Sequence, residues 1–195
     1  MDKSIKLALN KYLQIPPSLA LPGSLAPKDE MTVDMATPAK ANGLSDQALK
    51  AVVEGSTLAM EAHDRLEATQ SHKLIEIARG DIQTAVGILM DSRDRFGESK
   101  WASLQAAEKV LKAAIELEGS KYRFGHELAP LCEQIASLGI TFEWAPLVSS
   151  IQCSPSIRYG ETACTRQEAV EAHQSSLELV VALAKAGAKF KRGLQ

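Results

Sequence analysis

An alanine-rich stretch, WASLQAAEKVLKAAIELEG (residues 101–119), carries the clearest structural signal in the chain. Its apolar residues recur every three or four positions, which places them on one side of an α-helix. They are Leu104, Ala107, Leu111, Ala114 and Ile115. Gly119 follows them, as glycine commonly does where a helix ends. Because a helix with one apolar side must bury it against other elements, this stretch predicts a helical core.

The preceding residues also have a helical pattern. Residues 44–96 contain no proline and show the same spacing of apolar residues. Gly55 and Gly80 are the two positions at which this run could be interrupted. We expect Gly97 to end the run and Ser99 to start the next helix.

Two segments with helical character and one without follow residue 119. Residues 126–139 place leucines on one face, whereas residues 140–164 have no clear period. Thr165 and Glu168 match the T-x-x-E capping box, so a final helix should cover residues 166–185. The sequence therefore predicts an all-α fold, an antiparallel four- to five-helix bundle.

The N-terminal part differs in composition. Five of the eight prolines lie in the first 38 residues, together with Ala, Ser, Lys and Gly. Such a segment cannot propagate a helix and has little apolar surface to bury. We expect residues 1–43 to form an irregular N-terminal extension, either flexible or partner-binding, and residues 44–195 to form the bundle.

Composition excludes several classes of protein. The net charge of −2 gives no overall nucleic-acid signature, so such contacts would need a local basic patch. No apolar run approaches the roughly 20 residues that span a bilayer, and the N-terminus lacks a continuous signal-peptide core. The three cysteines form no CxxC, which favours reduced thiols over a zinc site. We expect a cytoplasmic protein without membrane contact, metal or cofactor.

Residues 100–140 contain the series AAEKVLKA, a glycine turn at Gly119 and the pair His126 and Leu128. With this series they resemble the centre of a HEPN domain, the helical bundle named for higher eukaryotes and prokaryotes nucleotide-binding. That family shows an AAEKxLKA helix, a glycine turn, a His-x-Leu entry into the next helix and a later Arg-Tyr element. The matching residues are Ala106, Ala107, Glu108, Lys109, Leu111, Lys112, Ala113, Gly119, His126, Leu128, Arg158 and Tyr159. Residues 77–92 resemble the family's first helix, so the resemblance covers about residues 70–188.

The resemblance implies a four-helix bundle that is often a homodimer. Some members cleave RNA without a metal, others bind or modify nucleotides, and many pair with a nucleotidyltransferase partner protein in toxin–antitoxin systems. In the ribonuclease members, an arginine is followed after four to six residues by a histidine. The histidine takes the proton of the ribose 2′-hydroxyl and the arginine stabilises charge on the phosphate.

The segment TRQEAVEAH fits that ribonuclease signature through Arg166 and His173, the candidate catalytic residues. Seven residues at about 100° each return to nearly the same face of a helix. However, His173 shares its stripe with Val170, Leu177 and Val181. The alternative is therefore a hydrogen-bonded histidine in the core or in an interface. A second pair, Arg65 and His72, has the same spacing outside the place expected for the family.

Three residues are better placed for nucleotide or RNA binding: Arg123, Arg158 and Tyr159. An arginine beside an aromatic ring can hold a phosphate while the ring stacks on a base. The family's Arg-Tyr element is usually followed by proline and an acid, but Gly160 follows here, so a structural salt bridge for Arg158 stays open. His126 matches a helix-entry position and is interpreted as a capping or packing residue.

These features leave three functions open. The leading hypothesis is a HEPN-like helical protein that binds nucleotide, RNA or a protein partner without efficient catalysis. The first alternative is a metal-independent endoribonuclease of the HEPN toxin class, with an Arg/His pair at a dimer interface. The second is a helical scaffold that only presents interaction surfaces.

Overall fold

The computed structural model describes residues 46–69, 72–91 and 93–190. In these ranges the chain forms six α-helices and one 3-10 helix, with no strand, which confirms the all-α prediction. The N-terminal extension 1–43 and its boundary to the bundle lie outside the described residues. The elements are α3 (Asp46–Glu67), α4 (Lys73–Met90), α5 (Phe96–Leu117), α6 (Leu128–Ser137), α7 (Ala145–Ile151), η2 (Pro155–Tyr159) and α8 (Arg166–Lys185).

The chain divides into two compact units, residues 1–60 and 61–195. The first is described from Asp46 onward, where it forms most of α3. In this part of the helix, the Thr57 hydroxyl donates a hydrogen bond to the Val53 carbonyl at 2.8 Å. The second unit contains the end of α3 and the five following α-helices. None of the helices that the structure describes is long and apolar enough to cross a membrane.

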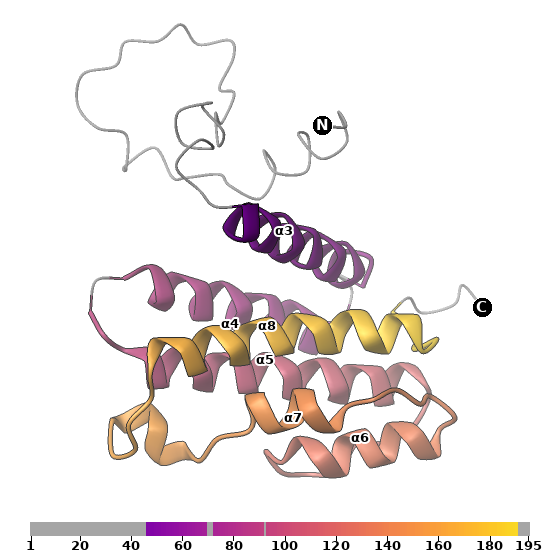
Figure 1. The fold of residues 1–195 in the computed structure, drawn as a ribbon. Helices are drawn as coiled ribbons and strands as arrows, with labels where there is room; N and C mark the ends of the chain where they lie inside the picture. Colours follow the sequence, from indigo (N-terminus) through magenta and orange to yellow (C-terminus); the bar gives the residue numbers. More distant parts are fainter. Residues whose placement is uncertain (1–45, 70–71, 92, 191–195) are drawn as a thin grey trace, which may run out of the picture. The chain divides into compact units, whose positions relative to one another are not determined.

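Within the second unit, α5 lies in the middle of the helical packing (Figure 1). α4 packs along α5 and also contacts α8, and the short link between α4 and α5 makes that pair antiparallel. α6 and α7 lie against α5 on the side away from α4 (Figure 1), and α7 also packs against α8. The 3-10 helix η2 contacts α5. This central position requires α5 to be buried on more than one face.

The sequence of α5 meets that requirement. Its predicted apolar stripe is buried, with Leu104, Leu111 and Ile115 fully inaccessible. The opposite side is buried as well: Ala106 is 1% and Ala113 0% exposed. Alanine on this second side lets neighbouring helices approach closely. On the first side, each buried leucine or isoleucine contributes about 1.5–3 kcal/mol to the free energy of folding. The prediction of the stripe is therefore confirmed, but the stripe is only part of the buried surface of α5.

The prediction that Gly97 ends a helix is wrong. α5 begins at Phe96, so Gly97 lies in its first turn and Ser99 is buried inside the helix. The reason is a close contact: a Cβ on Gly97 would stand 2.1 Å from the Ile157 carbonyl oxygen. Glycine is needed there so that the backbone of η2 can pack on α5, a tertiary reason with no local signature.

The helical run predicted for residues 44–96 is interrupted at neither of the two glycines considered. Gly55 lies inside α3 and Gly80 inside α4, whereas the break falls between Glu67 and Lys73. At the ends of later helices glycine behaves as expected, since Gly119 and Gly139 have φ of +81° and +89°. These helix ends were predictable from the sequence, because each depends on a single glycine in the left-handed backbone conformation.

The region without a clear period contains α7 and η2, which are too short to establish one. The prediction of the final helix is confirmed. Thr165 caps α8 by accepting from the Glu168 N–H, and the Glu168 carboxylate accepts from the Thr165 N–H at 2.7 Å. The buried face of α8 is rotated relative to the predicted stripe, because Val170 is 39% exposed. Its fully buried positions include Ala169, Ala172, Leu179 and Leu183.

Candidate functional site

The loop between α5 and α6 is held in place by two glutamine side chains. Gln134 of α6 accepts from the Arg123 N–H at 3.2 Å and donates to the Lys121 carbonyl at 2.7 Å. Gln152, which follows α7, donates to the His126 carbonyl at 3.4 Å. The side-chain amides of both glutamines thus hydrogen-bond to the loop backbone. These bonds fix the backbone positions from which the loop side chains extend.

Beneath this loop lies an ionic cluster of the buried Glu108 and Lys112 with the exposed His126. The side chains of Glu108 and Lys112 are 7% and 11% exposed, and Lys112 Nζ lies 2.5 Å from Glu108 Oε1. His126 Nδ1 lies 2.9 Å from Glu108 Oε2. Gln105 Nε2 donates to the same oxygen at 3.3 Å, and Lys112 Nζ also donates to the Gly125 carbonyl at 3.1 Å. Both buried charges therefore have a counter-charge and further hydrogen bonds, as burial requires.

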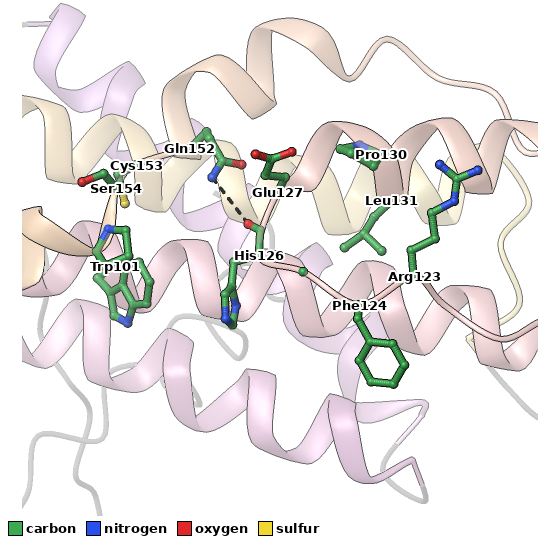
Figure 2. A pocket seen from close by; sticks show the side chains of 12 residues that line it. Trp101, Arg123, Phe124, His126, Glu127, Pro130, Leu131, Gln152, Cys153 and Ser154 are labelled. Atoms are coloured by element: carbon green, nitrogen blue, oxygen red, sulfur yellow. Dashed lines mark hydrogen bonds between the residues drawn. The ribbon is translucent and has the colours of Figure 1, made fainter.

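A pocket of about 590 Å³ opens beside this cluster (Figure 2). The Trp101 and His126 rings form part of its wall, with their centroids 6.3 Å apart and tilted by 52°. The volume falls within the roughly 300–1,000 Å³ typical of small-molecule sites. The lining residues come from α5, the α5–α6 loop, the start of α6 and the segment after α7: Trp101, Arg123, Phe124, Gly125, His126, Glu127, Pro130, Leu131, Gln152, Cys153, Ser154 and Pro155.

Charges in the pocket are separated. Figure 2 shows the Arg123 guanidinium at the end near Pro130, whereas the His126 imidazole points to the other side of the loop. No described residue hydrogen-bonds or pairs with the Arg123 guanidinium. The Glu127 carboxylate also lines the pocket and points away from the imidazole (Figure 2). The pocket thus offers an available cation at one end and an aromatic, hydrogen-bonding surface at the other.

The cysteine thiols near this region are not activated as nucleophiles. Burial raises the pKa of Cys153, which lines the pocket, to about 11. Burial also raises the pKa of Cys132 to about 12 and that of Cys164 above its ordinary value. Since the thiolate is the reactive form, Cys153 contributes a small apolar side chain to the pocket rather than covalent chemistry.

The candidate catalytic pair Arg166 and His173 lies on α8, outside the lining of the pocket. Arg166 is the first residue of α8 and is exposed. His173 is mostly buried, and its Nδ1 has no hydrogen-bond partner among the described residues. Burial lowers the pKa of His173 to about 4. This imidazole is therefore largely withdrawn from solvent.

The second pair with the same spacing is engaged in ion pairs. His72 Nε2 lies 3.2 Å from a Glu116 carboxylate oxygen. Arg65 lies 3.8 Å from the Glu61 carboxylate on the same helix. These contacts account for both residues without a ligand.

The predicted binding residues do not gather in one place. Arg123 lines the pocket, but Arg158 and Tyr159 lie on η2 and do not. Arg158 Cζ lies 5.8 Å from the centroid of the Tyr159 ring, which is 71% exposed. They form a separate exposed cation–π pair on the surface.

Sequence reasoning missed Trp101, Phe124 and Gln152 as pocket residues. The helical pattern marks Trp101 only as the start of a helix, and Gln152 stands in a region without a period. A signal was available for the loop, since YRFGH places two aromatic residues and an arginine directly before His126. For Gln152 no local signal exists, because its role depends on α7 returning to the α5–α6 loop.

Among residues 46–69, 72–91 and 93–190, no group of three or more His, Cys, Asp or Glu side chains could hold a metal ion. No protein-family model, curated protein or solved structure matches this chain.

Proposed function

We propose that this chain is a HEPN-like helical protein that binds a nucleotide, free or at the end of an RNA strand, without efficient catalysis. The observation that supports this most is the pocket beside His126. It combines the Arg123 guanidinium, unpaired among the described residues, with the Trp101 ring. A guanidinium can hold a phosphate through two parallel hydrogen bonds, and an indole can stack on a base.

The arrangement suits a ligand with two chemically different ends. The base would lie at the Trp101 and His126 end, and the phosphate would lie near Arg123 (Figure 2). Phe124, beside Arg123, is 97% exposed and offers a further surface for stacking. A stack of this kind is worth about 1–3 kcal/mol per base. The Glu127 carboxylate disfavours phosphate at its own position, which leaves the Arg123 end for the anion.

Binding can be measured through the fluorescence of Trp101. In a Trp144→Phe background Trp101 is the only tryptophan, because the chain has two. We expect saturable quenching by at least one of AMP, GMP, CMP and UMP. Arg123→Gln should weaken binding about tenfold or more, because a charge-assisted contact is lost. Raising the salt concentration should also weaken it.

Arg93→Gln is the matched control, since it removes an exposed arginine that does not line the pocket. It should leave the affinity within about twofold, the effect of a distant screened charge. Failure of all four nucleotides to bind, or equal losses in the two variants, would contradict the proposal.

RNA cleavage by Arg166 and His173 is the second candidate. The capping box supports it, because it places Arg166 in the first turn of α8 with His173 two turns later. The burial of His173 argues against it in the isolated protomer. The test is cleavage of single-stranded RNA in EDTA by the wild type and by His173→Asn. Cleavage that disappears in a folded His173→Asn variant would favour this function, and sedimentation would show whether a homodimer is needed.

A further inference from the structure

Glu108 determines where His126 carries its proton. Its carboxylate receives the Lys112 ammonium on Oε1 and the Gln105 amide on Oε2, and both of these groups are donors. An ion-paired carboxylate has no proton to give, so the contact at 2.9 Å between Glu108 Oε2 and His126 Nδ1 must use a proton on Nδ1. When the imidazole is neutral, Nε2 then carries a lone pair instead of a hydrogen.

Nε2 is available to a ligand. The His126 side chain is 67% exposed and lines the pocket, and no described residue hydrogen-bonds to Nε2. The Trp101 ring lies beside the imidazole at a tilt of 52°, and the hydrogen bond to Glu108 orients the imidazole. The Glu127 carboxylate points to the opposite side of the loop (Figure 2), so it does not compete for the position in front of Nε2.

We infer that His126 recognises the base of the bound nucleotide by accepting a hydrogen bond from a base N–H group at Nε2, with Glu108 as the positioning residue. This inference rests on the proposed nucleotide binding. It assigns different tasks to the two ends of the pocket: Arg123 binds any phosphate, whereas His126 distinguishes a base that offers an N–H from one that does not. Lys112 takes part by holding the Glu108 carboxylate in place and by donating to the Gly125 carbonyl beside His126.

The test compares each nucleotide with an analogue from which the N–H has been removed, in the Trp144→Phe background at pH 8. The pairs are AMP with purine riboside 5′-monophosphate, CMP with 2-pyrimidinone riboside 5′-monophosphate, GMP with 1-methylinosine 5′-monophosphate, which lacks both the N1–H and the 2-amino group, and UMP with its 3-methyl derivative. For the nucleotide that binds tightest, we expect the analogue to bind about tenfold more weakly, the effect of one hydrogen bond.

His126→Phe keeps an aromatic ring but has no acceptor. In this variant nucleotide and analogue should bind equally, whereas Arg123→Gln should weaken both by the same factor and preserve their ratio. The ¹⁵N spectrum of the imidazoles gives a second readout. Protonated and unprotonated ring nitrogens resonate far apart, and only the unprotonated nitrogen of His126 should shift strongly on binding. His126→Phe identifies its signals.

Three results would overturn the inference. Equal affinity for nucleotide and analogue in the wild type would leave the proposed function standing without a role for His126. A proton on Nε2 of the neutral imidazole would contradict the positioning by Glu108. Absence of binding by all four nucleotides would overturn the inference and the proposed function together.

Discussion

Two histidines show two ways in which this fold accommodates an imidazole. His126 lies at the edge of the core against Glu108, which is itself paired with Lys112. His173 lies within the packing of α8, where its Nδ1 has no partner among the described residues and burial lowers its pKa to about 4. The first leaves its Nε2 without a hydrogen-bond partner among the described residues, while burial of the second favours its neutral form. Neighbours from other elements, rather than residue type, decide the difference.

Removing the counter-charge from the Glu108 cluster should have the largest effect. Glu108→Leu keeps the side-chain volume but leaves the buried Lys112 ammonium without its partner. We expect the free energy of unfolding to fall by about 3–5 kcal/mol, as when one partner of a buried pair is deleted. Urea denaturation followed by circular dichroism measures this.

The double variant Glu108→Leu with Lys112→Met should recover most of that loss, because no charge remains buried. As an exposed control, Lys185→Ala breaks the pair with Glu61 at 3.4 Å and should change stability by less than about 1 kcal/mol. If Glu108→Leu alone lowered the free energy of unfolding by less than about 1 kcal/mol, Lys112 would reach solvent easily. The Glu108 cluster would then not differ from His173 in the way described.

Acid should destabilise the fold through His173. Its folded-state pKa of about 4 lies below the ordinary value of 6.5, because burial disfavours the charged form. As the pH falls from about 6.5 to 4, the unfolded chain takes up a proton that the folded chain does not. Stability is therefore full above pH 6.5 and falls by up to about 3 kcal/mol towards pH 4. Denaturation series at pH 7, 5.5 and 4.5 measure the slope.

The comparison with His173→Leu isolates this contribution, because carboxylates act equally in both proteins. The variant should lose less stability between pH 7 and 4.5 than the wild type. If the wild type and His173→Leu lost the same stability between pH 7 and 4.5, the imidazole would be hydrated in solution and its pKa would not be lowered.

At neutral pH His173→Leu should have the smallest effect, a gain of about 1 kcal/mol. It removes a buried nitrogen without a hydrogen bond and keeps apolar volume. His72→Leu is the matched control: its Nδ1 is also unsatisfied, but its Nε2 contacts Glu116 at 3.2 Å. That variant should gain nothing. A loss of stability in His173→Leu, seen as a lower midpoint of thermal unfolding, would indicate an unrecognised partner of His173.

Several features of the fold were predictable because they depend on neighbours in the sequence. The capping box at Thr165 and the left-handed glycine at position 119 act within one turn, and both were located correctly. The buried stripe of α5 follows from helical periodicity alone. The role of Gly97 was not predictable, because it depends on the carbonyl of Ile157, sixty residues later in the chain.

The same distinction applies to the candidate site, where some features follow from neighbours in the sequence and others only from the packing of the helices. Arg123 was identified from its type and its neighbours, but its distance from Arg158 and Tyr159 depends on how η2 packs against α5. The buried side of α8 was misjudged by part of a turn, since small residues such as Ala169 and Ala172 pack as closely as larger ones. Periodicity weighted towards large side chains cannot detect an interface made of alanines.

The sequence by itself determined that this chain forms helices and where α5, α6 and α8 end, because those choices depend on spacing, caps and glycines within a few residues. Only the tertiary structure decided which polar residues lie together in the candidate site. It brought Glu108, Lys112 and His126 into one ionic cluster and placed Gln152 against the loop that carries His126. Hydrogen bonds and ion pairs between distant segments depend on distances of a few ångströms, which only the packing of the helices sets.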